Sequence, residues 1–272
     1  MCHACVMETV KQRMLSRRHV LTAAPAIAAA TVAGGAFAPR AYAQEGRRIV
    51  DMTYVIDADF PTWSGPPGIE TEQLAKFEES GFNAFKMTVF EHTGSHVDAP
   101  LHFSADGLSV DEIAPENLVC PLCVIDIRAK ADADVEAQVT PEDLQAWIDA
   151  HGDIPDGALV AMNSGWQQYV ATEKFAGLDE NGVRHYPGFH VEAAQMLIEQ
   201  TGAVAIATDS LSLDIGSTQS FDTHYAWLPT GRYGVENIAN LDQVPASGAM
   251  VFVGAPTHRG GSGGPARILA MV

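Results

Sequence analysis

Three histidines and one aspartate stand within eleven residues, in the run 91–103 (Glu-His-Thr-Gly-Ser-His-Val-Asp-Ala-Pro-Leu-His-Phe). The four residues are His92, His96, Asp98 and His102. Neutral imidazole and carboxylate are ligands that zinc, manganese and iron accept in proteins. All four occupy even positions, and alternate side chains of a strand share one face. Gly94 and Pro100 disfavour a helix. The segment before the run, 85–90, has strand-like content. We therefore predict a strand that runs into an extended loop, with four metal-capable groups on one side.

The same run resembles the signature of the cyclase family of metal-dependent hydrolases, which includes bacterial kynurenine formamidase and isatin hydrolase. Ser95 is the one departure, since the family usually has Thr there, and Ser keeps the hydroxyl. Other segments also fit the family: Phe60-Pro61-Thr62-Trp63, Ser164-Gly165-Trp166, Pro187-Gly188-Phe189, Asp209 and the glycine-rich run 260–267. The resemblance covers most of residues 44–272 and implies a swivelling β/β/α architecture.

The spacing predicts that His92, His96 and Asp98 bind one divalent ion. The resemblance implies more, because His224 and Glu236 match positions that complete a second metal site in members like kynurenine formamidase. Asp98 would then bridge two ions. The alternative, suggested by members like isatin hydrolase, is a single ion with His224 beside it. The expected cofactor is Zn²⁺ or Mn²⁺, as one or two ions.

His102 is predicted to be the catalytic acid or base rather than a ligand. It lies four residues beyond Asp98 and past Pro100, and an imidazole titrates near neutrality. The candidate substrate-binding residues are Phe60, Trp63 and Trp166. Aromatic side chains belong more often to a core. Trp63, in a proline-rich loop, is the strongest candidate of the three.

The rest of the chain predicts one α/β domain over residues 44–272. One helix begins at Pro141 after the N-cap residue Thr140 and ends before Gly152. A second helix carries Val191, Ala194, Leu197 and Ile198 at helical spacing and stops at Gly202. Short apolar runs at strand length fall at 48–56, 85–90, 123–128, 158–163, 203–208, 250–253 and 268–272.

Residues 1–43 resemble a twin-arginine export signal that is removed. Arg17 and Arg18 precede a weakly apolar stretch, and Ala41-Tyr42-Ala43 is a small-x-small cleavage pattern. A membrane anchor over 20–38 is the alternative, and Pro25 with the glycines near 34 makes it a poor span. We expect a periplasmic or secreted protein that meets the export machinery transiently and keeps no stable membrane anchor.

Charge excludes some partners. The chain has 16 Lys and Arg and 34 Asp and Glu; residues 1–43 hold five of the basic and one of the acidic residues, so the remainder has a net charge of −22. Such a large negative charge disfavours binding to nucleic acid or to an anionic membrane. Cys120 and Cys123 are expected to be two small buried residues, with a local disulfide as the alternative.

The sequence therefore predicts an exported, divalent-metal-dependent hydrolase that cleaves the C–N bond of a small aryl or cyclic amide. Two alternatives stay open: a lactone or ester hydrolase on the same scaffold, and an extracytoplasmic metal-binding protein without catalysis. The expected partner is a small-molecule substrate, and the resemblance implies a homodimer.

Overall fold

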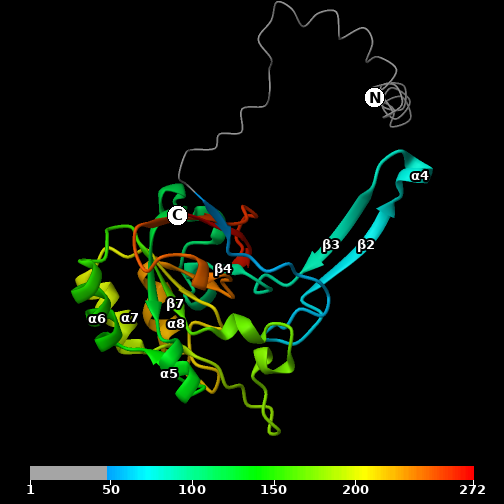
Figure 1. Cartoon of the computed structure of the whole chain (residues 1–272). Coiled ribbons are helices and arrows are strands. Elements are labelled where there is room, and N and C mark those ends of the chain that lie inside the picture. The colour runs from blue at the N-terminus through cyan, green and yellow to red at the C-terminus, as the bar shows by residue number, and fades with distance from the viewer. Residues whose placement is uncertain (1–47) are drawn as a thin grey trace, which may run out of the picture. The chain divides into compact units, whose positions relative to one another are not determined.

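A mixed, nine-stranded sheet forms the centre of the larger of two compact units, residues 48–71 and 87–272 (Figure 1). The computed structural model describes residues 48–272, so the predicted export signal lies outside the described residues. In spatial order the strands are β1 (Ile49–Asp51), β13 (Arg267–Met271), β11 (Ala249–Gly254), β5 (Val119–Asp126), β7 (Leu159–Asn163), β9 (Ala205–Thr208), β10 (Tyr233–Glu236), β4 (His96–Asp98) and β12 (Gly263–Pro265). The expected α/β class is confirmed.

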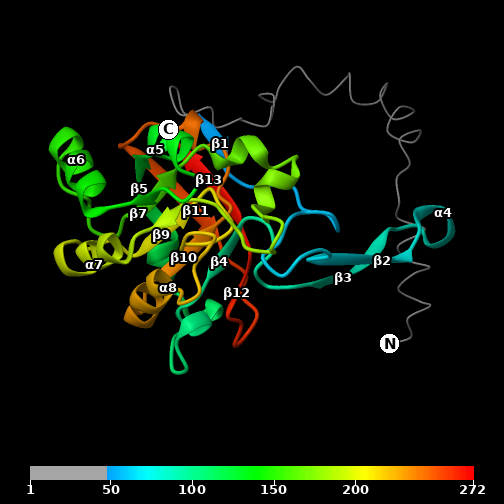
Figure 2. The ribbon, with the colours of Figure 1, turned by 90° about the horizontal axis from the view of Figure 1, so that it is seen from below.

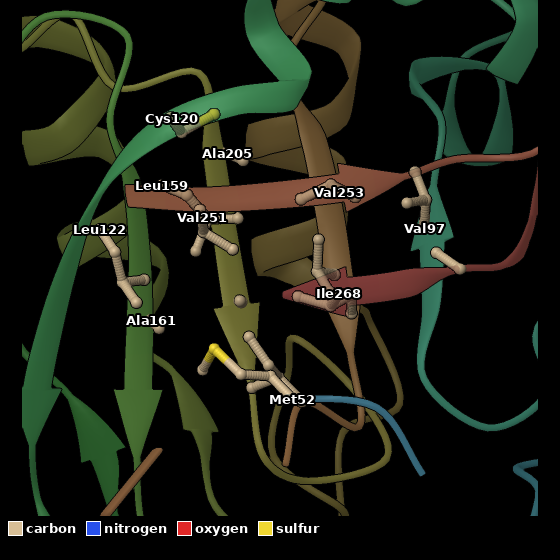
Figure 3. Packing of buried hydrophobic residues seen from close by; sticks show 14 of the residues in the cluster. Met52, Val97, Cys120, Leu122, Leu159, Ala161, Ala205, Val251, Val253 and Ile268 are labelled. Carbon is tan, nitrogen blue, oxygen red and sulfur yellow. The ribbon is translucent and has the colours of Figure 1, made fainter. Parts of the chain in front are cut away.

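The central strands β5, β7, β9 and β10 run parallel, and they are buried on both faces. Continuous apolar runs are typical of such strands. In β5, Leu122 and Val124 point into a core that the curled sheet encloses, while Cys123 and Ile125 point to the helices. Figure 3 shows the enclosed core, which contains Leu122 of β5 together with residues of the antiparallel strands such as Val251 and Ile268.

Helices cover the other face of the parallel strands; they are α5 (Arg128–Ala133), α6 (Pro141–His151), α7 (Val191–Gln200) and α8 (Asp222–Trp227). Figure 2 shows α6 and α7 side by side along the sheet. The start of α6 is fixed by a capping box between Thr140 and Asp143. Leu144 of α6 and Leu197 of α7 are fully buried against the strands. Both predicted helices are confirmed.

The remaining elements of this unit are short. A two-stranded sheet pairs β6 (Gln138–Val139) with β8 (Gly188–Phe189). The 3₁₀ turns are η1 (Pro100–Phe103), η2 (Val110–Glu112), η3 (Pro115–Leu118), η4 (Trp166–Tyr169), η5 (Glu173–Ala176), η6 (Leu228–Thr230) and η7 (Leu241–Gln243). Cys120 and Cys123 are free and buried, as expected. Within residues 48–272 no helix has the length and apolarity that a membrane span requires.

The prediction of one strand face for four metal-capable residues is wrong. β4 contains only His96 to Asp98. Gly94 interrupts the extended backbone with φ +65, and a β-carbon there would lie 2.1 Å from Ile56 Cγ2. Pro100 begins the turn η1 directly after the strand. His92 therefore lies in a loop and His102 in a 3₁₀ turn, so alternation explains only the two residues within β4.

The smaller compact unit comprises, among the described residues, 72–86. It contains most of the hairpin formed by β2 (Ile69–Ala75) and β3 (Ala84–Val89), with the short helix α4 (Phe77–Ser80) between them. Helix α4 ends at Gly81, which adopts the left-handed conformation that favours glycine. Several apolar side chains of this unit are exposed: Leu74, Phe77, Phe82 and Phe85.

Candidate metal centre

The pairing of β4 with β10 brings three ligand-type residues onto one face of the sheet. The strands are antiparallel, with Glu236 opposite His96 and Gly234 opposite Asp98. The intervening residues Val97 and Val235 point into the enclosed core. Because side chains alternate along a strand, His96, Asp98 and Glu236 point away from that core. Each of these three polar residues is at most 6 % exposed.

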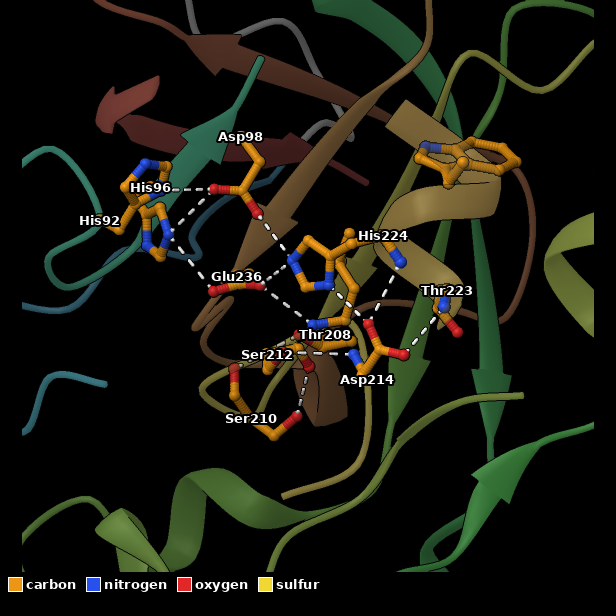
Figure 4. A network of polar contacts seen from close by, with 12 residues as sticks. His92, His96, Asp98, Thr208, Ser210, Ser212, Asp214, Thr223, His224 and Glu236 are labelled. Carbon is orange, nitrogen blue, oxygen red and sulfur yellow. Dashed lines mark hydrogen bonds and ion pairs between the residues drawn. The ribbon is translucent and has the colours of Figure 1, made fainter. Parts of the chain in front are cut away.

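His224 enters the same cluster from α8, and Asp214 holds it there (Figure 4). The Asp214 carboxylate accepts hydrogen bonds from the backbone N–H groups of Thr223 and His224, at 2.8 and 3.1 Å. It thereby caps the start of the helix. Its Oδ2 also lies 2.6 Å from His224 Nδ1. The other ring nitrogen, Nε2, lies 3.2 Å from Glu236 Oε1.

His96 and Asp98 present polar atoms that lack hydrogen bonds. His96 Nδ1 lies 2.8 Å from the Gly94 carbonyl oxygen, and its Nε2 lies 3.3 Å from both Asp98 Oδ1 and Glu236 Oε2. Among the described residues, His96 Nε2 and Asp98 Oδ2 are buried without a hydrogen-bond partner. Buried polar atoms are rarely left unpaired, so these two indicate a ligand of the cluster.

His92 completes the cluster from the loop before β4. Its Nδ1 lies 2.6 Å from Asp98 Oδ1, and its Nε2 lies 3.1 Å from Ser262 Oγ. His102 stacks on His92 with ring centroids 3.8 Å apart. Two overlapping groups of metal-capable atoms result, one of His92, His96 and Asp98 and one of Asp98, His102 and His224.

The carboxylates and imidazoles of the cluster stabilise one another's charged forms. Burial disfavours the imidazolium of His96, but the nearby carboxylates of Asp98 and Glu236 outweigh it and raise the pKa of His96 to about 10. The same partners with Asp214 raise the pKa of His224 well above its usual value, against the effect of burial. Burial raises the pKa of Asp98, and the surrounding imidazoles of His224, His92 and His96 hold it well below its usual range nonetheless. The cluster therefore favours bound positive charge.

This donor set fits a divalent metal ion. Imidazole nitrogens and carboxylate oxygens suit Zn²⁺ and Mn²⁺, and such ions replace ligand protons on binding. The residues that would hold an ion are His92, His96, Asp98, His224 and Glu236. The Nδ1 atom of His96 faces the Gly94 carbonyl oxygen, and the Nδ1 atom of His224 faces Asp214. Metal-binding histidines typically make such a hydrogen bond with the ring nitrogen that does not bind the ion.

A largely apolar pocket of about 280 Å³ opens beside the cluster. His92, His102, His224 and Glu236 line it on the polar side. The other lining residues are Trp63, Ser64, Phe90, Phe103, Leu211, Ser212 and Phe221. Trp63 packs against Phe221 at 5.8 Å between ring centroids, and the residue is 46 % exposed. The pocket suits a small molecule with an aromatic part.

Two predicted substrate-binding residues lie elsewhere. Phe60 and Trp166 belong to a buried aromatic cluster with Phe175 and Tyr186, and they do not line the pocket. Trp166 is tied there by hydrogen bonds from its indole nitrogen to the Phe175 carbonyl and from its backbone N–H to Asp209. Trp63 does line the pocket, as do His92 and His102.

Several residues of the site were missed by sequence reasoning. Asp214 carries no local sign of its role, because the helix that it caps begins eight residues later. Phe103 contacts the His224 ring at 4.5 Å, and Phe221 lies on the pocket wall. Phe103 follows the predicted acid–base residue His102, and Phe221 precedes the predicted ligand His224 by three positions. This closeness in the sequence was the available signal.

Comparison with known proteins agrees with this geometry. A family profile described as putative cyclase matches residues 50–215. Isatin hydrolase of Roseibium aggregatum is 30 % identical over 243 residues, which cover 82 % of this chain and 91 % of that protein. Kynurenine formamidase of Bacillus anthracis is 38 % identical over 79 residues, 29 % of this chain and 38 % of that one.

A solved structure shares the fold. Isatin hydrolase A from Labrenzia aggregata, bound to benzyl benzoate, superimposes with a TM-score of 0.78 at 33 % identity, covering 85 % of this chain and 96 % of that chain. The large curled mixed sheet with a few helices is common to both, which confirms the predicted architecture. By profile, sequence and fold, this chain belongs to the cyclase family of hydrolases.

Proposed function

We propose that this protein is a divalent-metal-dependent hydrolase that opens the C–N bond of a small aryl or cyclic amide. The observation that carries the proposal is the buried cluster of three histidines and two carboxylates at the end of an apolar pocket. The names of its relatives, isatin hydrolase and kynurenine formamidase, support an amide as the substrate class.

A bound divalent ion would supply a Lewis acid that polarises a carbonyl and lowers the pKa of water toward about 7. The chain supplies the rest. His92, His96, Asp98, His224 and Glu236 hold the ion, and their buried position excludes bulk water. The aromatic walls, with Trp63 and Phe221 in contact, orient a flat substrate with its carbonyl toward the cluster.

His102 moves the proton in this proposal. Burial, together with the nearby His92 and His224, lowers the pKa of His102 to about 4, although Asp98 and Glu236 act in the opposite direction. The ring is therefore neutral at pH 7 and accepts a proton from the attacking water. As the carbon–nitrogen bond breaks, the imidazolium returns that proton to the leaving nitrogen. The products are a carboxylate and an amine.

The test is metal analysis followed by a substrate panel. Protein purified without a metal-binding tag should contain a divalent ion, and His96→Ala should lose the ion and the activity together. The panel pairs each aryl or cyclic amide with its lactone or ester counterpart. Faster turnover of the oxygen compounds would favour the lactonase alternative. Bound metal without turnover of any compound would favour a metal-binding protein.

We also propose that the protein is exported and forms a homodimer. The first proposal is supported by the paired arginines and the cleavage pattern within residues 1–43, and the second by the resemblance to the cyclase family. Light scattering on the protein that lacks residues 1–43 measures the mass directly. A mass near that of one chain would contradict the dimer.

A further inference from the structure

Ser262 lies behind His92, on the side away from Asp98. Its Oγ is 3.1 Å from His92 Nε2 and 2.5 Å from Glu91 Oε2, and its backbone N–H donates to the same carboxylate oxygen at 3.2 Å. The other carboxylate oxygen of Glu91 lies 2.6 Å from His258 Nε2. These contacts form a continuous chain of hydrogen bonds that ends on the His92 ring.

The direction of the hydrogen bonds follows from the chemistry of the groups. An ionised carboxylate only accepts hydrogen bonds, so the Ser262 hydroxyl donates its hydrogen to Glu91. The hydroxyl oxygen is then left to accept, and the donor that faces it is His92 Nε2–H. If the Ser262 hydroxyl donated to His92 instead, no hydrogen would lie between Ser262 Oγ and Glu91 Oε2, which are 2.5 Å apart.

The three histidines of the cluster therefore differ. His96 and His224 turn Nε2 toward the carboxylates, while their Nδ1 atoms face the Gly94 carbonyl and Asp214. His92 is turned the other way, since its Nδ1 faces Asp98 at 2.6 Å. The choice of coordinating nitrogen is set by the hydrogen bond that the other nitrogen makes.

We propose that Ser262 and Glu91 are positioning residues that keep the proton of His92 on Nε2, so that His92 presents Nδ1 to the metal ion while His96 and His224 present Nε2. This inference rests on the proposed metal centre. Ser262 and Glu91 act through His92 and do not contact the substrate, because neither lines the pocket.

The glycines on either side of Ser262 allow this hydrogen-bonded arrangement to form. A β-carbon on Gly263 would lie 2.9 Å from His92 Cε1 and 2.3 Å from the Val97 carbonyl oxygen. A β-carbon on Gly261 would lie 2.7 Å from Glu91 Oε1 and 2.1 Å from His258 Nε2. The loop can approach the His92 ring and the Glu91 carboxylate only because both positions lack side chains.

A different reading of the same atoms is a serine nucleophile. Ser262, His92 and Asp98 are spaced like a Ser-His-Asp triad, and Ser262 is the centre of a Gly-x-Ser-x-Gly pattern at 260–264. The contacts oppose this reading. The hydroxyl donates to Glu91 rather than to His92, and Ser262 does not line the pocket where a substrate carbonyl would lie.

The decisive experiment is nuclear magnetic resonance of protein loaded with ¹¹³Cd²⁺ and labelled with ¹⁵N-histidine. The ¹¹³Cd–¹⁵N coupling identifies each coordinating nitrogen, and the spectrum of His92→Gln assigns the His92 signals. We expect coupling to Nδ1 of His92 and to Nε2 of His96 and His224. Coupling to Nε2 of His92 overturns the inference. Absence of coupling to all three histidines overturns the metal centre itself, and with it the proposed function.

Affinity measurements test the role of the two positioning residues. Titration of metal-free protein with Zn²⁺ against a chromophoric chelator should show a dissociation constant 10- to 100-fold higher for Ser262→Ala and for Glu91→Gln than for the unchanged protein. Ser247→Ala, which alters a half-buried serine in the loop before β11, is the matched control and should bind as the unchanged protein does. Unchanged affinity in Ser262→Ala, or labelling of Ser262 by a fluorophosphonate, would refute the positioning role.

Discussion

The position of His102 suits both a metal ligand and a general acid or base. Its ring lies flat on His92, with 3.8 Å between ring centroids, and it belongs to a group of metal-capable atoms with Asp98 and His224. It also faces the pocket and sits in the turn η1 rather than in the strand. The five other residues, His92, His96, Asp98, His224 and Glu236, would hold an ion without its help.

We therefore expect His102→Ala to keep its metal and to lose turnover. A positioned general acid or base contributes typically 10²- to 10⁴-fold in rate, so kcat should fall by about that factor while KM changes less. Metal content per chain and kcat on the best amide substrate are measured on the same preparation. Loss of metal in step with His96→Ala would make His102 a ligand instead.

At the residue scale, the sequence predicted ligands that lie close together and missed the groups that hold them. His92, His96 and Asp98 could be found because three metal-capable residues fall within seven positions. Asp214 could not, because it acts on a helix through two backbone N–H groups and one ring nitrogen. Such roles depend on three-dimensional proximity, which no local pattern records.

Asp209 shows how one buried carboxylate fixes the end of a neighbouring element. It follows β9, and it accepts hydrogen bonds from the Ser164 hydroxyl at 2.5 Å and from the Trp166 backbone N–H at 2.9 Å. These residues form the turn after β7, the parallel neighbour of β9. Burial raises the pKa of Asp209 from 3.8 to about 6, although these hydrogen bonds lower it.

This shift predicts a dependence of stability on pH. A carboxyl whose pKa is higher in the folded than in the unfolded protein stabilises fully below the unfolded value of 3.8, and it loses that contribution as pH rises through about 6. Two pKa units amount to roughly 3 kcal/mol. Asp209→Asn does not titrate, so the free energy of unfolding of the unchanged protein, relative to this variant, should fall by roughly that amount between pH 4 and pH 7. A difference independent of pH in denaturant titrations would refute this.

At the element scale, caps and long apolar runs were informative and short strands were not. The helix after Thr140 was predictable from a capping box and a proline at its first position. The extended segment predicted over residues 92–102 is extended as a strand only in β4, and it is broken at Gly94 and at the turn that begins at Pro100. The strand β10 has four residues, and its pairing with β4 depends on a neighbour more than 130 residues away.

At the scale of the whole molecule, the predicted export signal can be tested without changing the net charge of the chain. Changing Arg17 and Arg18 together to Lys should stop export through a twin-arginine route while charge stays the same. Fractionation of a bacterial host, with detection of the cleaved and uncleaved chains, measures this. Arg40→Lys, a change of the same type near the cleavage pattern, is the control and should be exported. Export of the Lys-Lys protein would show that the paired arginines are not the signal.

The first and last strands of the sheet are neighbours: β1 pairs with β13, with Ile49 opposite Met271. During synthesis β1 emerges from the ribosome early and waits for more than two hundred residues before its partner exists. Until residues 267–271 have been made, the strands that carry Val50 and Val251 of the enclosed core lack the strand that lies between them in the sheet. An interrupted translation product would thus expose apolar surface and become a substrate for proteases, rather than persist as a partly active enzyme. The pairing of the first strand with the last therefore makes completion of this sheet depend on completion of the chain.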